Sequence, residues 1–94
     1  PEVIKRGKVG LFTIKTDPAN TCLSAIIYKN KSDKWVSVEL PKMQADSSGI
    51  CKWEWTVPLD SASGDVGAFR VGVRNSVESK DLPPQGFCVE TCSP

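Results

Sequence analysis

Apolar and polar residues alternate along most of this chain, which is the two-residue period of a β-strand with one buried face. The clearest alternation spans residues 50–57, where Trp53 and Trp55 fall on one face, between charged residues of the other. The same pattern predicts six strands, over residues 9–15, 22–28, 35–40, 50–57, 68–74 and 87–91. No stretch keeps the spacing of an amphipathic helix over a helix's usual length, so the chain is predicted to be all-β.

Turn-forming residues separate these strands at short intervals. The segments Asp17–Asn20, Asn30–Asp33 and Asp46–Gly49 are rich in Asp, Asn, Pro, Ser and Gly. Longer loops are predicted over residues 58–67 and 75–86. Short strands separated in this way are typical of a β-sandwich of about seven antiparallel strands. Because no linker or internal repeat interrupts it, the chain is predicted to form one domain over residues 1–94.

The apolar faces of the strands predict the hydrophobic core. Two tryptophans on one strand face would supply much of it, since each buries about 150–250 Å². The residues expected in the core are Phe12, Ile14, Ile26, Tyr28, Val36, Val38, Trp53, Trp55, Val57, Phe69, Val71 and Val73.

Four cysteines, an even number in a chain of 94 residues, predict two disulfides and an oxidising compartment. A zinc site is the alternative, but the chain has no C-x-x-C pair. Of the three possible pairings we favour Cys22–Cys51 with Cys88–Cys92, although the other two stay open. Cys22 and Cys51 lie near the starts of two strands, and the starts of antiparallel neighbours lie at opposite ends. A Cys88–Cys92 bridge requires a turn over residues 89–91.

Composition excludes several kinds of site. The 12 Lys and Arg and the 11 Asp and Glu nearly cancel, which argues against a nucleic-acid partner. The absence of histidine removes His-dependent triads and His metal sites. Scattered carboxylates, including the Asp60–Asp65 segment, lack the ligand set of a dedicated calcium site. No catalytic residue, metal site or cofactor is therefore predicted, and no apolar run is long enough for a membrane span.

Two segments together resemble an immunoglobulin-like domain of secreted bacterial proteins. The first is Thr16-x-Pro18-x-x-x-Cys22, and the second is Ala45-Asp46-x-x-Gly49 followed by Trp53-x-Trp55-x-Val57. The resemblance covers roughly residues 9–75 and implies an immunoglobulin-like sandwich. It also implies a non-catalytic role, in a domain that stands alone or is appended to an extracellular hydrolase. Members of this family often carry a second cysteine where this chain has Val73, so the family's disulfide cannot be carried over.

One aromatic residue falls on the polar side of its strand. Trp35 shares that side with Ser37 and Glu39, and the three are predicted to form a surface contact site. The alternative is that the loop after Asn30 or the Pro83–Pro84 segment covers the ring.

The function predicted from these features is a non-catalytic, secreted or extracytoplasmic interaction or accessory module, with a binding or a structural role. Its partner would be an extracellular protein or a polysaccharide. The main alternative is a small inhibitor of an extracellular enzyme that acts through an end loop, residues 58–67 or 75–86. An enzyme is the third possible class, and it would need polar groups that converge in a pocket.

Overall fold

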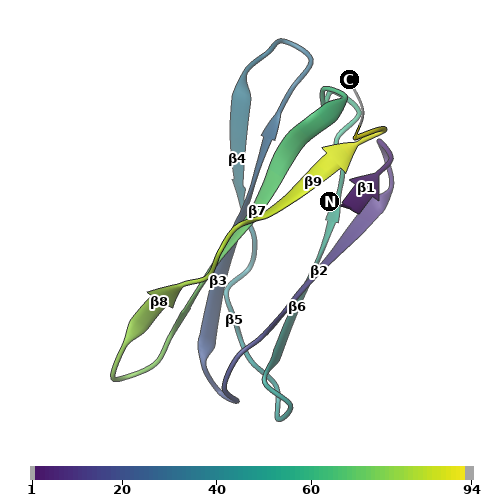
Figure 1. Ribbon diagram of the computed structural model, residues 1–94. Coiled ribbons are helices and arrows are strands. Elements are labelled where there is room, and N and C mark those ends of the chain that lie inside the picture. The colour runs from purple at the N-terminus through teal and green to yellow at the C-terminus, as the bar shows by residue number, and fades with distance from the viewer. Residues whose placement is uncertain (1, 93–94) are drawn as a thin grey trace.

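The computed structural model describes residues 2–92, which form strands and no helix, as the alternation predicts (Figure 1). The strands are β1 (Glu2–Ile4), β2 (Val9–Lys15), β3 (Thr21–Lys29), β4 (Trp35–Glu39), β5 (Met43–Gln44), β6 (Ile50–Thr56), β7 (Gly64–Arg74), β8 (Ser79–Asp81) and β9 (Gln85–Val89). With no helix in this range, the described chain contains none that could cross a membrane.

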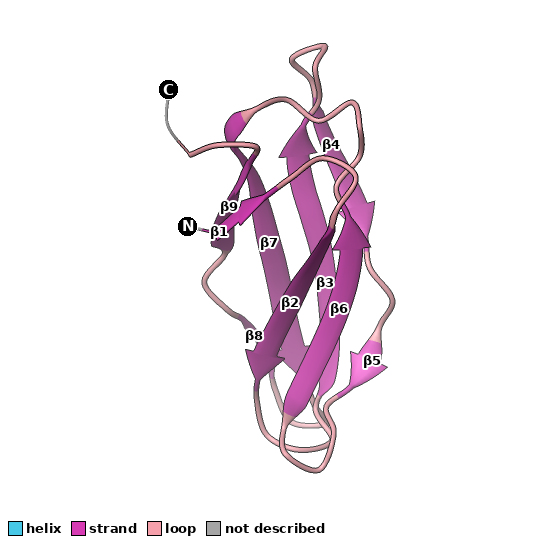
Figure 2. Ribbon diagram, turned by 90° about the vertical axis from the view of Figure 1, so that its right-hand side faces the viewer, coloured by secondary structure: helices cyan, strands magenta, loops and turns pink. Residues whose placement is uncertain are grey.

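The strands lie in two layers that face each other (Figure 2). The larger sheet has the order β1-β9-β7-β3-β4, with β5 paired to one end of β3 and β8 to one end of β7. The smaller sheet contains β2 and β6. Pairing is antiparallel except between β1 and β9, which run parallel. The predicted β-sandwich is confirmed, with a parallel pair that the sequence pattern did not indicate.

The chain crosses between the layers four times, from β1 to β2, from β2 to β3, from β5 to β6 and from β6 to β7. In order and pairing, β2 and β6 correspond to strands B and E of an immunoglobulin domain, and β3, β7 and β9 to strands C, F and G. The fold itself is a disulfide-stapled β-sandwich.

The strand boundaries depart from the predictions most clearly around β7 and β9, and the strand predicted over residues 87–91 ends at Val89. β7 begins at Gly64, within the predicted 58–67 loop, because a register shift between Gly64 and Gly67 breaks the alternation there. The predicted 75–86 loop contains β8 and the first residues of β9. β1, β5 and β8 were not predicted, since strands of two or three residues are too short to show a period.

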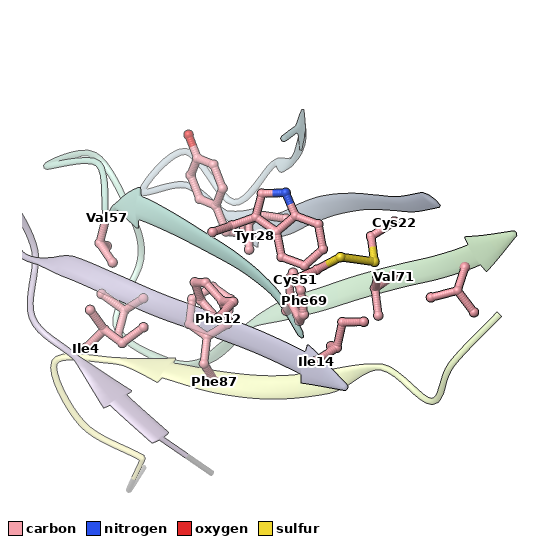
Figure 3. Packing of buried hydrophobic residues seen from close by; sticks show 14 of the residues in the cluster. Ile4, Phe12, Ile14, Cys22, Tyr28, Cys51, Val57, Phe69, Val71 and Phe87 are labelled. Carbon is pink, nitrogen blue, oxygen red and sulfur yellow. A yellow bond between two sulfur atoms is a disulfide. The ribbon is translucent and has the colours of Figure 1, made fainter. Parts of the chain in front are cut away.

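The core fills the space between the two sheets (Figure 3). The predicted core residues are buried, except that Val36, Val38 and Trp55 are half-buried and pack against the core. The first two are less buried because β4 is an edge strand. Core residues that were not predicted come mainly from the chain ends and the cysteines: Ile4, Cys22, Ala45, Cys51, Phe87 and Val89.

Aromatic rings hold the centre of the core. Phe69, from β7, contacts the rings of Phe12 and Trp53 on the smaller sheet, with centroids 4.9 and 5.5 Å apart. The indole Nε1–H of Trp53 donates a hydrogen bond of 2.8 Å to the carbonyl of Pro41. This bond satisfies the one polar group of a buried ring. It also ties β6 to the segment that follows β4.

The Cys22–Cys51 disulfide joins the two sheets, and both cysteines are fully buried. Their Cα atoms are 6.7 Å apart. The rule for antiparallel neighbours does not apply to this pair, because β3 and β6 are not neighbours: they belong to different layers, and both begin at the same end of the sandwich. Val73 lies opposite Cys22 in the β3–β7 register.

The Cys88–Cys92 disulfide closes the expected turn after β9. Glu90 has a φ of +67°, and the Thr91 N–H donates to the Val89 carbonyl at 2.8 Å, so the chain reverses within three residues. The favoured cysteine pairing is therefore confirmed at both bridges. Two disulfides indicate an oxidising environment.

Gly67 allows Phe87 to pack flat against β7. A Cβ at this position would lie 2.1 Å from Cζ of Phe87, whose ring is buried and cannot move aside. We expect Gly67→Ala to lower the free energy of unfolding by about 1–3 kcal/mol or more, the usual cost of overpacking. Urea denaturation measures the loss. Gly72→Ala is the matched control, because its added Cβ would meet an exposed carboxylate oxygen of Asp81 at 3.0 Å and the Lys80 carbonyl at an ordinary contact distance of 3.7 Å. Equal losses in the two variants would contradict the explanation.

Candidate binding face on the larger sheet

The outer face of β7, β3 and β4 brings together residues from three separate parts of the chain. The strand register places Ala25 of β3 between Arg70 of β7 and Glu39 of β4. In the next row Ile27 lies between Ala68 and Ser37. This face points away from the core, so its side chains are available for contact.

These strands form the floor of a shallow groove of about 620 Å³. Leu23, Ala25 and Ile27 supply an aliphatic floor along β3. Small residues at the centre and long ones at the margins explain the hollow, since Gly72 and Ala25 leave space that Arg70 and Glu39 border. Leu23 is 37% exposed, a large apolar side chain open to a partner.

Charged side chains of both signs line the groove. Arg70 and Arg74 lie along β7, Glu39 lies on β4, and Asp81 on β8 is opposite Gly72. Within residues 2–92 none of these four forms an ion pair. Their hydrogen-bonding groups are therefore free to orient a charged or polar partner.

Trp35 lies one row beyond the groove, on the same face. Its side chain faces solvent, as predicted, and is 63% exposed, so neither the loop after Asn30 nor the Pro83–Pro84 segment covers it. The Lys29 ammonium lies 5.8 Å from the ring centroid and also pairs with Asp33. Ser37 and Glu39 line the groove itself. The structure thus places the three predicted contact residues together, and their role in binding stays a prediction.

The groove was not predicted, because no single strand carries its signal. Its floor depends on which residues of β3, β4 and β7 are opposite one another, and the sequence pattern does not give that register. A row of small residues on three outward faces would have been the sign to look for.

Outside the groove, residues 2–92 show fewer features that suggest a binding or catalytic site. No group of three or more His, Cys, Asp or Glu within residues 2–92 could hold a metal ion. The pKa of Tyr28 is raised, first by burial and then by the charge of Asp60. A smaller pocket of about 240 Å³ lies near Lys15, Asn20 and Glu78, at the end of the sandwich. The outer face of the smaller sheet exposes two aliphatic side chains, Val9 and Leu11.

The two end loops of the inhibitor alternative differ in shape. Residues 58–63 are held down, since the Arg6 side chain donates to the Ser61 carbonyl at 2.8 Å and to the Ser63 hydroxyl at 2.6 Å. The segment after β7 is a hairpin that projects from one end of the molecule (Figure 1). Val77, at its tip, is 89% exposed.

A scan against protein-family models finds no matching family, and searches of curated proteins and of solved structures find no significant match.

Removing the Trp35 side chain is expected to leave the fold intact. Because the ring is mostly exposed, Trp35→Ala should change the free energy of unfolding by no more than about 0.5 kcal/mol. Thermal unfolding measures this. A loss of several kcal/mol would mean that the ring supports the core, and would remove Trp35 from the candidate binding face.

Proposed function

We propose that this chain is a non-catalytic interaction module that works outside the cytoplasm and binds a protein partner on the outer face of β7, β3 and β4. The observation that carries the proposal is the groove itself: an aliphatic floor bordered by unpaired charges of both signs. Protein interfaces combine an apolar centre with a polar rim in this way.

The same observations favour a protein over a polysaccharide. Aliphatic side chains of β3 form the floor of the groove, and Trp35, the one large exposed aromatic residue in the described range, lies outside it. Charges of opposite sign on facing margins suit a partner whose own charges alternate in sign. A polysaccharide remains the other partner class to test.

Two observations on residues 2–92 support a non-catalytic role. The carboxylates do not gather there into a metal-binding cluster, and all four cysteines are held in disulfides. The sequence resemblance to immunoglobulin-like domains of secreted bacterial proteins supports the same role and an accessory or stand-alone domain. The two disulfides support secretion.

An enzyme inhibitor is the second candidate, and the projecting β7–β8 hairpin favours it. Its tip exposes Val77, an apolar side chain that could enter a pocket on an enzyme. Val77→Asp would abolish inhibition if the hairpin acts in this way. It would leave binding at the groove unchanged.

The proposal is tested with two leucines that occupy similar places on opposite sheets. Leu23 lies in the groove floor, whereas Leu11 lies on the outer face of the smaller sheet and is 55% exposed. The purified domain is immobilised and exposed to the extracytoplasmic proteins of its source cells, and in parallel to a panel of polysaccharides. Retained molecules are quantified for wild type, Leu23→Glu and Leu11→Glu.

We expect Leu23→Glu to reduce retention of a specific protein by about tenfold or more, since it places an unpaired charge in an apolar contact. Leu11→Glu should retain that protein as the wild type does. Equal retention by all three forms would refute the groove as the binding site. Retention of a polysaccharide alone would identify the other partner class.

A further inference from the structure

β4 is an edge strand of the larger sheet, and no strand within residues 2–92 pairs with its outer side. It pairs with β3 alone, and in Figure 1 its other side is open. The hydrogen bonds at its two ends show which residues face which way. Leu40 N–H donates to the Ser24 carbonyl at 3.0 Å, and Asn30 N–H donates to the Lys34 carbonyl at 2.9 Å.

In an antiparallel pair every second residue bonds to the neighbouring strand. The backbone groups of Lys34 and Leu40 both point toward β3, so the backbone groups of the even-numbered residues between them do the same. The N–H and C=O groups of Trp35, Ser37 and Glu39 therefore point to the open edge. Such a row of unpaired backbone groups is a template for an added strand.

We propose that a second copy of this chain occupies that edge, with the two β4 strands antiparallel about a two-fold axis at Ser37. Trp35 of one copy then lies opposite Glu39 of the other, and Ser37 lies opposite its own counterpart. All three are residues whose backbone groups point outward. On the inner side Val36 lies opposite Val38 of the other copy, and both of these side chains are only half-buried in the single chain.

Charge complementarity favours a second copy as the occupant. Glu39 has no ion-pair partner within residues 2–92 of its own chain. In the dimer it reaches Trp35 of the other copy, whose ring already has the Lys29 ammonium 5.8 Å from its centroid. Lys29 also pairs with Asp33 of its own chain, an exposed carboxylate, so in the dimer its ammonium would be shared between Asp33 and Glu39 of the other copy. The two-fold axis would produce this contact twice per dimer.

The two neighbouring registers are worse, which fixes the alignment. A shift by two residues in one direction places Glu39 opposite Asp33 of the other copy, two like charges. A shift in the other direction places Trp35 opposite Pro41, which has no N–H to donate. A shift by one residue would place Val36 and Val38 of one copy on the same side as the outer, polar face of the other copy. Only the register centred on Ser37 therefore remains.

Pairing in this way would join the two grooves. Ser37 and Glu39 line the groove of each copy, so the two outer faces would become one continuous face across the dimer. This inference does not depend on whether the groove binds a partner. It concerns the edge of the sheet, and its test uses the purified chain alone.

The test removes one outward N–H. Ser37→Pro deletes a donor that faces the open edge and takes no part in the β3–β4 ladder, and proline is tolerated at such edge positions. Ser37→Ala is the matched control, because it removes the hydroxyl and keeps the N–H. Sedimentation velocity at increasing concentration, up to about 1 mM, measures the association, and circular dichroism verifies the fold.

We expect concentration-dependent dimers for the wild type and for Ser37→Ala, and a monomer for Ser37→Pro at every concentration. Glu39→Lys places a new ammonium near the Lys29 ammonium of the other copy, so it should weaken the dimer by about tenfold or more. This variant replaces Ser37→Pro as the test if Ser37→Pro fails to fold. A wild type that stays monomeric throughout would overturn the proposal. So would a dimer that survives both Ser37→Pro and Glu39→Lys, or one that Leu11→Lys dissociates, because the contact would then lie on β2.

Discussion

Trp53→Ala is expected to lower the free energy of unfolding by about 3–5 kcal/mol, the usual cost of truncating a buried aromatic residue. The ring is 3% exposed, contacts Phe69 across the core, and donates its N–H to Pro41. The substitution leaves a cavity between the sheets and an unpaired carbonyl. Urea denaturation of the disulfide-bonded protein measures the loss.

Two other tryptophans serve as internal controls for this variant. Trp35→Ala should be nearly neutral. Trp55→Ala should fall between the two, because its ring is half-buried and contacts Tyr28 and Phe87 at the edge of the core. If Trp53→Ala costs no more than Trp35→Ala, the cross-sheet packing described above is not what stabilises the fold.

Replacing both Cys22 and Cys51 by alanine is the second large expected effect. The bridge closes a loop with a sequence separation of 29 and joins the two layers. Its loss should cost about 3.5 kcal/mol through the entropy of the unfolded chain. Because both sulfur atoms are buried in the core, lost packing adds to this figure.

The second bridge is the matched comparison. Cys88 and Cys92 close a loop with a sequence separation of only four, so the same relation gives a smaller loss of about 2 kcal/mol. Denaturant unfolding of the two double variants gives their order. A larger loss at residues 88 and 92 would mean that the bridge between the sheets is not the main covalent support of the fold.

Strands with a clear alternation could be predicted from the sequence, and β2 was placed at its observed bounds. The short strands could not, because β1 and β8 form only where a longer strand presents free backbone groups beside them. Phe87 lies in the core but was not among the predicted core residues, for a related reason. Its inward direction depends on the packing against Gly67, which lies far away in the sequence.

The candidate binding face likewise has one part that could be predicted from the sequence and one part that could not. The outward direction of Trp35, Ser37 and Glu39 follows from alternation within one strand and could be predicted. Arg70 and Leu23 join them only through the β3–β7 register, which turns and crossovers set at the level of the whole fold. The groove therefore depends on how the three strands are aligned in the sheet, and the sequence of a single strand does not show it.

The parallel pairing of β1 with β9 has a mechanical consequence. Because the two strands run in the same direction, a force that pulls residue 2 and residue 92 apart slides one strand along the other. The Cys88–Cys92 bridge passes the force from residue 92 to Cys88, so the rungs at Phe87 and Cys88 bear the load together. An antiparallel pair pulled from one end would instead open rung by rung. A domain joined end to end in an extracellular chain would thus resist tension through its terminal strands.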